Sequence, residues 1–271
     1  MLFFKTTIII FVYTVAATAK ASERTERYRK LLAQEQRVEA LDDIAREFSL
    51  GPWPQETIKE FKSGQREIGE TFISERAQHL YEVGVSLTYK GDNSAVRSLI
   101  GASQVESENL KILLSLARSY LSQSDCAGAS ESINKITKNF FLLEEKYILA
   151  GQLLVCKKKL DELSEQIVPA ESFSPPYRVH AMILSLRAAE VVRDVSLIKT
   201  LGLELSKTEP QMPESYYWLW KYELKKSARK DYGDRYLSLC QNLSTKIKRK
   251  FYMEPILCSS VEEVRGASEK T

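Results

Sequence analysis

The chain has 271 residues, of which 44% are hydrophobic and 28% are charged, and its formal net charge is +3. This is the composition of an ordinary globular protein. Eleven glycines and eight prolines are few for this length, which favours a helical fold over a β fold with many turns.

The N-terminus has the layout of a secretory signal. Lys5 precedes an apolar run over Thr6–Ala17, and the small residues that follow suit a signal peptidase. We expect cleavage after Ala19 or Ala21, so that residues 1–21 are a signal peptide and the mature chain is secreted or periplasmic. The rival interpretation is an N-terminal membrane anchor on a chain that faces outside the cytoplasm, because the run approaches the roughly 20 residues that cross a bilayer.

Charge limits the classes of partner. Cleavage after Ala21 removes two lysines, Lys5 and Lys20, and lowers the formal charge from +3 to +1. So small a charge leaves no case for a general nucleic-acid binder or a membrane-surface binder. We therefore expect no nucleic-acid partner and no stable membrane insertion of the mature chain.

Residues 22–70 precede the repeats. The highly charged stretch Ser22–Phe48 has helical spacing of its apolar residues and is expected to form one long helix that packs on the first repeat. Gly51–Pro54 ends this helix, because two prolines flanking Trp53 force an extended link. A short helix over Glu56–Phe61 is expected next.

The stretch Glu106–Phe141 organises the rest of the chain. Its first part places apolar residues at the i, i+3, i+4 and i+7 positions of one helical face, and its second part repeats this spacing. Asp125, between them, suits the N-cap of the second helix. Small residues at Ala117 and Ala129 would let the helices approach closely. The stretch therefore predicts two amphipathic helices joined by a tight turn.

Related units recur along the chain. Residues in the middle of each first helix are 33, 34, 35 and 35 positions apart, and they are Gly84, Ala117, Gly151, Leu186 and Lys221. The predicted turns within the units are Gly91–Asn93, Ser124–Asp125, Lys158–Lys159, Arg193–Asp194 and Lys230–Asp231. Pro210 ends the fourth unit, where a helix must stop.

A helix–turn–helix unit with a period near 34 resembles the tetratricopeptide repeat family. Leu113–Phe141 carries the family's pattern best, with Ala117, Tyr120, Ala129 and Ile133 at the right spacing, whereas Lys221 replaces a small residue in the last unit. The resemblance implies an all-α, right-handed superhelix (α-solenoid) of about five helix pairs over residues 71–260, after the N-terminal helix. An irregular helical bundle is the alternative. Residues 261–271 are predicted to be a frayed C-terminal tail.

Four cysteines in an exported chain predict disulfide bonds. In the repeat arrangement Cys126 begins a second helix, Cys156 ends the first helix of the next unit, and stacked units bring these ends together. This arrangement favours Cys126–Cys156 and, by elimination, Cys240–Cys258. Four free buried thiols are the alternative, and a zinc site is disfavoured because no CxxC pair or nearby histidine accompanies the cysteines.

No pattern in the sequence points to catalysis. His79 and His180 are the two histidines, each lies on a predicted helix, and neither stands in a catalytic frame. No GxSxG, HExxH, phosphate-binding or dinucleotide-binding fingerprint occurs. We therefore expect no catalytic residue, no metal and no cofactor.

The resemblance implies that the first helices line a concave groove that holds a protein or peptide. The implied groove residues are Tyr81, Lys111, Arg118, Gln152, His180, Arg187, Trp218, Tyr222 and Lys225. Such cations and aromatics suit an extended peptide with acidic groups or a C-terminal carboxylate. Replacing Arg118 and Arg187 together by alanine is expected to weaken binding with little loss of Tm.

These expectations describe an exported, non-enzymatic scaffold that binds a protein or peptide partner in the cell envelope. The alternative is a cell-wall-associated hydrolase, or an accessory domain of one, with a helical superstructure. Activity against peptidoglycan would distinguish the alternative from the scaffold.

Overall fold

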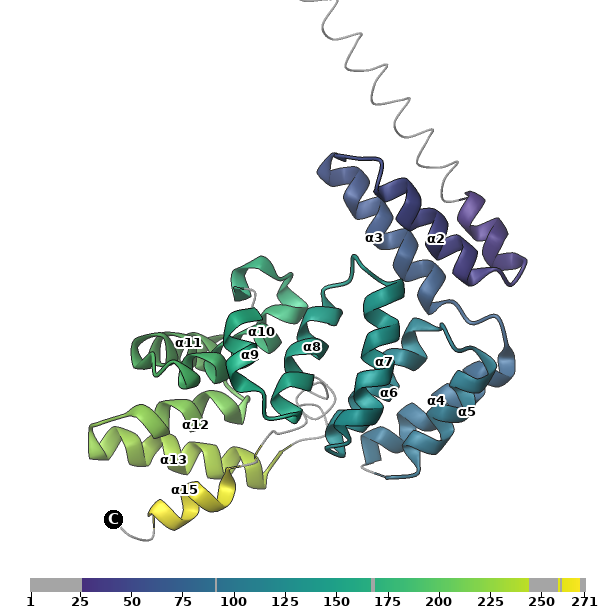
Figure 1. The fold of residues 1–271 in the computed structure, drawn as a ribbon. Helices are drawn as coiled ribbons and strands as arrows, with labels where there is room; N and C mark the ends of the chain where they lie inside the picture. Colours follow the sequence, from purple (N-terminus) through teal and green to yellow (C-terminus); the bar gives the residue numbers. More distant parts are fainter. Residues whose placement is uncertain (1–25, 91, 167–168, 244–257, 259, 269–271) are drawn as a thin grey trace, which may run out of the picture.

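The computed structural model describes residues 26–90, 92–166, 169–243, 258 and 260–268. Every regular element in this part of the chain is helical, which confirms the all-α class. The expected signal peptide over residues 1–21 lies outside the described residues. Figure 1 shows successive pairs of helices arranged along an arc, with α2 and α3 packed at one end.

The N-terminal region contains two helices where one was predicted. Residues 26–33 are helical, and α2 (Arg37–Phe48) follows after a turn. Glu35 at this turn has a φ of 61°, and the N–H of Gln36 donates to the Leu31 carbonyl at 3.0 Å. The prediction of a single helix over Ser22–Phe48 is therefore wrong, because the chain folds back and buries Tyr28 in the core beside Ile44.

The link after α2 is extended as predicted, and the following helix is longer than predicted. Trp53 donates its indole N–H to the Phe48 carbonyl at 2.8 Å and packs edge-on against Phe61, so it anchors the link to the core. The helix α3 (Gln55–Glu70) then continues well past Phe61.

Within the described residues, five pairs of consecutive helices follow α3. They are α4 (Glu75–Lys90) with α5 (Ala95–Val105), α6 (Leu110–Ser122) with α7 (Cys126–Asn139), α8 (Glu145–Cys156) with α9 (Leu160–Gln166), α10 (Pro175–Val191) with α11 (Val195–Thr208), and α12 (Pro213–Tyr222) with α13 (Lys226–Gln241). A short 3₁₀ helix, η1 (Ala170–Ser172), precedes α10, and α15 (Val261–Ser268) packs on α13. The first helices begin 35, 35, 30 and 38 residues apart, so the period is regular only in the first three pairs.

Three of the predicted turns share one geometry. Ser124, Lys158 and Arg193 have φ values of 59°, 59° and 55°, and each following N–H donates to the carbonyl five residues earlier at 2.9 Å. This is how a helix closes through a left-handed residue. Asp125 and Asp194 then cap the next helix by accepting from the backbone N–H three residues later, at 3.0 and 2.9 Å. The turn at Glu35 repeats the same closure.

The two ends of the last pair differ from the predictions. Lys230 and Asp231 lie inside α13, and the chain instead reverses at Glu223–Lys225, because α12 has only ten residues. The C-terminal residues predicted to be frayed form α15 over Val261–Ser268. Val264 in this helix is fully buried, and Glu263 accepts a hydrogen bond from Tyr217 at 3.0 Å.

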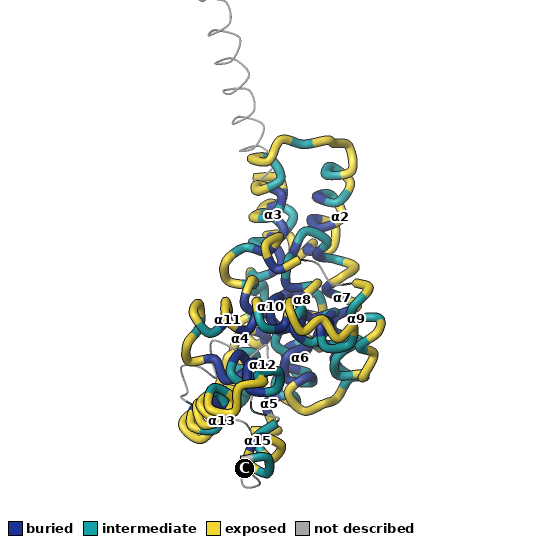
Figure 2. Tube along the Cα trace, turned by 90° about the vertical axis from the view of Figure 1, so that its left-hand side faces the viewer, coloured by how far each residue is buried: buried dark blue, intermediate teal, exposed yellow. Residues whose placement is uncertain are grey.

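Small residues let the paired helices approach closely, as the repeat predicted. A Cβ at Gly84 would lie 2.7 Å from the side chain of Leu99 on the paired helix α5, and one at Gly151 of α8 would lie 2.7 Å from Leu184 on α10, the first helix of the next pair. Ala117 is fully buried. One apolar cluster runs from the N-terminal helices to α15, and a smaller one lies between α4, α5 and α6. Figure 2 shows these buried segments in the interior, with exposed residues on the outer faces of the helices.

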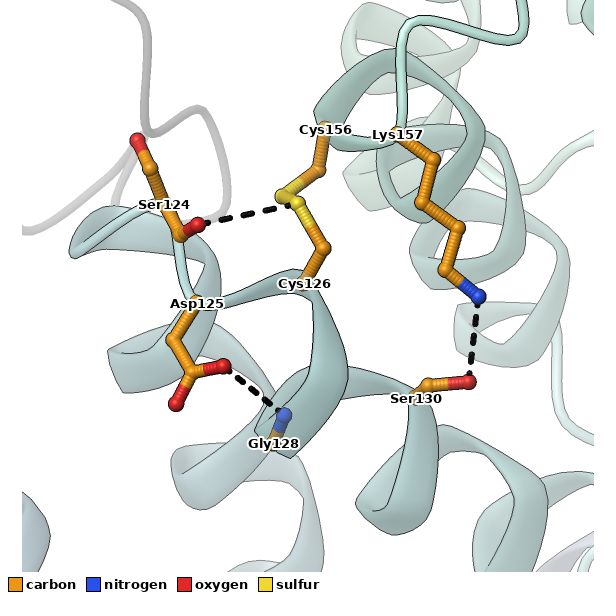
Figure 3. Close-up of a disulfide and its surroundings, with 7 residues drawn as sticks. All are labelled: Ser124, Asp125, Cys126, Gly128, Ser130, Cys156 and Lys157. Carbon is orange, nitrogen blue, oxygen red and sulfur yellow. Dashed lines mark hydrogen bonds between the residues drawn. A yellow bond between two sulfur atoms is a disulfide. The ribbon is translucent and has the colours of Figure 1, made fainter.

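Both predicted disulfide bonds are present. Cys126 begins α7 and Cys156 ends α8, and their Cα atoms are 5.8 Å apart (Figure 3). Beside this bond Lys157 contacts the Ser130 hydroxyl at 3.3 Å. Cys240 on α13 is bonded to Cys258, with a Cα–Cα distance of 5.6 Å. The first bond therefore links adjacent helix pairs, and the second links α13 to the chain just before α15.

Candidate functional site

The polar stripe predicted to line a groove is used largely to join neighbouring first helices. Arg187 on α10 forms an ion pair with Glu214 on α12 at 2.7 Å, and Trp218 also donates to Glu214, at 3.3 Å. Trp218 is only 2% exposed, so in this structure it cannot receive a partner's side chain. Half-buried Tyr222 donates to Glu190 of α10 at 3.3 Å. At this end of the stripe only Lys225 is exposed.

Because Arg187 is ion-paired with buried Glu214, replacing Arg118 and Arg187 together by alanine should lower Tm, contrary to the expectation from the sequence. Arg187→Ala should lower the free energy of unfolding by about 2–4 kcal/mol, since it removes the cation beside a carboxylate that is buried. Denaturant unfolding measures this loss. Arg178→Ala, an exposed position on the same helix, should change stability by less than about 0.5 kcal/mol. Equal effects of the two substitutions would contradict the assignment.

The middle of the stripe is buried as well. Arg118, Gln152 and His180 are 8%, 3% and 5% exposed. Glu145, about two helical turns before Gln152 on α8, is also buried; it is ion-paired with Arg66 of α3 and accepts a hydrogen bond from Tyr177 of α10. The N-terminal helix α3 therefore contacts the beginnings of α8 and α10 through this one carboxylate. Desolvation and the hydrogen bond to Glu145 raise the pKa of Tyr177.

The beginning of the stripe stays accessible, between α4 and α6. Tyr81 and Lys111 are half-buried, and Phe72 lies between them, 5.2 Å from the Tyr81 ring and 5.7 Å from the Lys111 ammonium. Next to them is a small pocket of about 40 Å³, which we call the Tyr81 pocket. It is lined by Tyr81, Val85, Thr88, Tyr89, Ser115 and Arg118. Two of the predicted groove residues, half-buried Tyr81 and buried Arg118, thus line one small pocket.

A second hollow was not predicted from the sequence. It lies between α2, the start of α4 and the α5–α6 loop, has a volume of about 390 Å³, and is called the acidic cleft below. Its carboxylate residues are Glu35, Glu39, Glu106 and Glu108, and its apolar residues are Val38, Ile73 and Val105. Sequence periodicity gave no sign of it, because the cleft exists only where α2 lies beside the chain segments before α4 and after α5.

A buried ion pair forms the floor of the acidic cleft. Glu106 Oε2 lies 2.8 Å from the Arg37 guanidinium, and both side chains are 5% exposed. The other oxygen accepts from the backbone N–H groups of Ile73 and Ser74 at 2.9 and 2.7 Å, just before α4. Burial would raise the pKa of Glu106, but the hydrogen bonds from Ser74 and Asn109 and the Arg37 cation together lower it. The carboxylate is thus held ionised. Through these contacts it joins α2 to the N-terminal ends of α4 and α6.

The described residues contain no group of three or more His, Cys, Asp or Glu side chains placed to hold a metal ion. In the same part of the chain, no helix has both the length and the apolar character that a membrane crossing needs.

No family model matches the chain, and no curated protein matches it. Function must therefore be argued from the surfaces described above.

Proposed function

We propose that the chain is an exported, non-enzymatic scaffold of the cell envelope, a tetratricopeptide-like right-handed superhelix that binds a protein or peptide partner. Repeated helix pairs closed by turns of the same geometry support the repeat assignment. Two disulfide bonds are compatible with an oxidising compartment outside the cytoplasm. The observation that carries the binding role is the Tyr81 pocket, an accessible site on the first helices of two neighbouring units.

The chemistry of this site suits a partner with a carboxylate. The buried cation Arg118 and the Ser115 hydroxyl line the pocket, and half-buried Lys111 lies over Phe72, which packs on Tyr81. Tyr81 and Phe72 supply aromatic faces for an apolar side chain. The ligand class is therefore an extended segment with an acidic side chain or a C-terminal carboxylate beside an apolar residue.

A photo-crosslinking residue at position 81 should capture the partner in the native envelope, and the same residue at Thr137 should not. Thr137 is exposed on α7, a second helix, and so controls for non-specific capture. Lys111→Glu should reduce the crosslink at position 81 about fivefold, because it replaces an attraction for carboxylate by a repulsion. Equal capture at both positions, or capture at Thr137 alone, would move the binding site away from the first helices.

A further inference from the structure

The acidic cleft is a candidate binding site separate from the Tyr81 pocket, because the two share no lining residue. Its volume of about 390 Å³ falls within the range of ligand sites, roughly 300–1,000 Å³. The cleft belongs to the junction between α2 and the first repeat.

The walls of the cleft combine uncompensated negative charge with exposed apolar surface. Glu35 and Glu39 are exposed, and no cation among the described residues pairs with either. Val38, on the same turn of the chain, is 48% exposed, and Val105 on the opposite wall is 39% exposed. Glu108 accepts a hydrogen bond from the neutral amide of Asn139, a contact that does not compensate its negative charge.

The floor contributes a donor that lacks an acceptor. Arg37 lines the cleft and is 5% exposed, and its Nε–H has no hydrogen-bond partner among the described residues. A buried donor without a partner is costly, and a peptide carbonyl is the kind of acceptor that satisfies it. The Glu106 carboxylate lies at the same floor beside Arg37, so an incoming carboxylate would be repelled there, whereas a neutral peptide carbonyl would not.

We propose that the acidic cleft binds an extended peptide segment in which a lysine or arginine stands beside an apolar residue. The cation lies against Glu35 and Glu39, and the apolar side chain lies between Val38 and Val105. Charge complementarity selects this occupant over an acidic segment. The inference goes beyond the proposed function. It assigns a binding surface in addition to the Tyr81 pocket, and its ligand is basic, whereas the segment proposed for the Tyr81 pocket is acidic.

The test uses the full mature chain and two blocked peptides as probes. The basic probe is acetyl-Gly-Val-Lys-Val-Lys-Gly-amide, and the acidic probe has glutamate in place of both lysines. In amide NMR titrations to about 1 mM, the range of weak peptide affinities, the basic probe should shift Val38 and Val105. The acidic probe should leave both unshifted. Absence of a shift with the basic probe, or equal shifts with both probes, would overturn the proposal.

Variants then locate the interaction. The double variant Glu35→Gln with Glu39→Gln should weaken the basic probe about fivefold, because it removes two surface ion pairs. Val38→Thr should weaken it too, since the shape is kept and the apolar contact is lost. Glu165→Gln, an exposed glutamate on α9, is the matched control and should have no effect. Unchanged affinity in the double variant contradicts the proposal.

The same titrations separate this proposal from the function proposed above. Shifts of Tyr81 and Lys111 with the acidic probe, and none at the cleft with the basic probe, would keep the scaffold function and reject the cleft. Shifts at the cleft with the basic probe, and none at Tyr81 and Lys111 with the acidic probe, would keep the cleft and reject the Tyr81 pocket as the binding site. Self-association in sedimentation that the double variant abolishes would assign the cleft to a second copy of the chain and overturn the peptide as its occupant.

Discussion

Glu106→Ala should lower the free energy of unfolding by about 3–5 kcal/mol. The substitution leaves the Arg37 guanidinium buried without its counter-ion, which is the costly way to break a buried ion pair. It also removes the acceptor for the N–H groups of Ile73 and Ser74 and for the Asn109 amide. Denaturant unfolding of the protein measures the loss.

Two comparisons make this prediction specific. Glu131→Ala removes an exposed glutamate that is paired with Lys135 on α7, and should cost less than about 0.5 kcal/mol. A double replacement of Arg37 and Glu106 by methionine and leucine should recover much of the loss, because no charge is then left buried. If the double replacement were no more stable than Glu106→Ala, the loss would come from packing or the backbone bonds and not from the orphaned cation.

The same carboxylate gives the stability a pH dependence. The folded protein lowers the pKa of Glu106 below its ordinary 4.5, so the folded state favours the ionised form. Its contribution is present above the unfolded pKa near 4.5 and is lost as the pH falls through the lower, folded pKa. In Glu106→Gln this part of the acid dependence should be absent. An unchanged difference in stability between wild type and Glu106→Gln from pH 6 to pH 3 would contradict it.

The parts of the fold that could be predicted were those with a local signal. The apolar spacing predicted the helices, and the acidic N-caps Asp125 and Asp194 marked two turns that the structure confirms. The turn at Glu35 had no such signal, since Gln34, Glu35 and Gln36 are ordinary helix formers. It is imposed by tertiary packing, which buries Tyr28.

The site was harder to predict, for a different reason. Helical spacing shows which residues share a face, but not whether a neighbouring helix covers that face. Arg187 is on the predicted stripe, yet α12 lies so close to α10 that Arg187 pairs with Glu214, and Trp218 turns inward and donates to the same carboxylate within α12. Arg37 and Glu106 are 69 residues apart, so no local pattern could reveal the cleft that they support.

Replacing Cys126 and Cys156 together by serine should lower the free energy of unfolding by about 3–4 kcal/mol. The bond spans 30 residues, and in the chain-entropy model a loop of this length restricts the unfolded chain by about that amount. The cost should appear in global unfolding, because α7 and α8 both belong to the continuous core. The free energy of unfolding of the wild-type chain, measured with and without reductant, provides the comparison for the double variant.

Loss of the Cys240–Cys258 bond should affect a local part of the fold, unlike loss of Cys126–Cys156. Its 18-residue separation nevertheless predicts a similar stabilisation, about 3 kcal/mol, in the chain-entropy model. Without it, α15 is still held by buried Val264 and by the hydrogen bond from Ser260 N–H to Tyr236 at 3.1 Å. Serine at Cys240 and Cys258 should therefore increase amide exchange in α15 well before the central helices unfold. Four alkylatable thiols in the natively folded protein would contradict both assignments. If the variant with serine at Cys240 and Cys258 lost amide-exchange protection in α7 and α8 but not in α15, the local role assigned to this bond would be wrong.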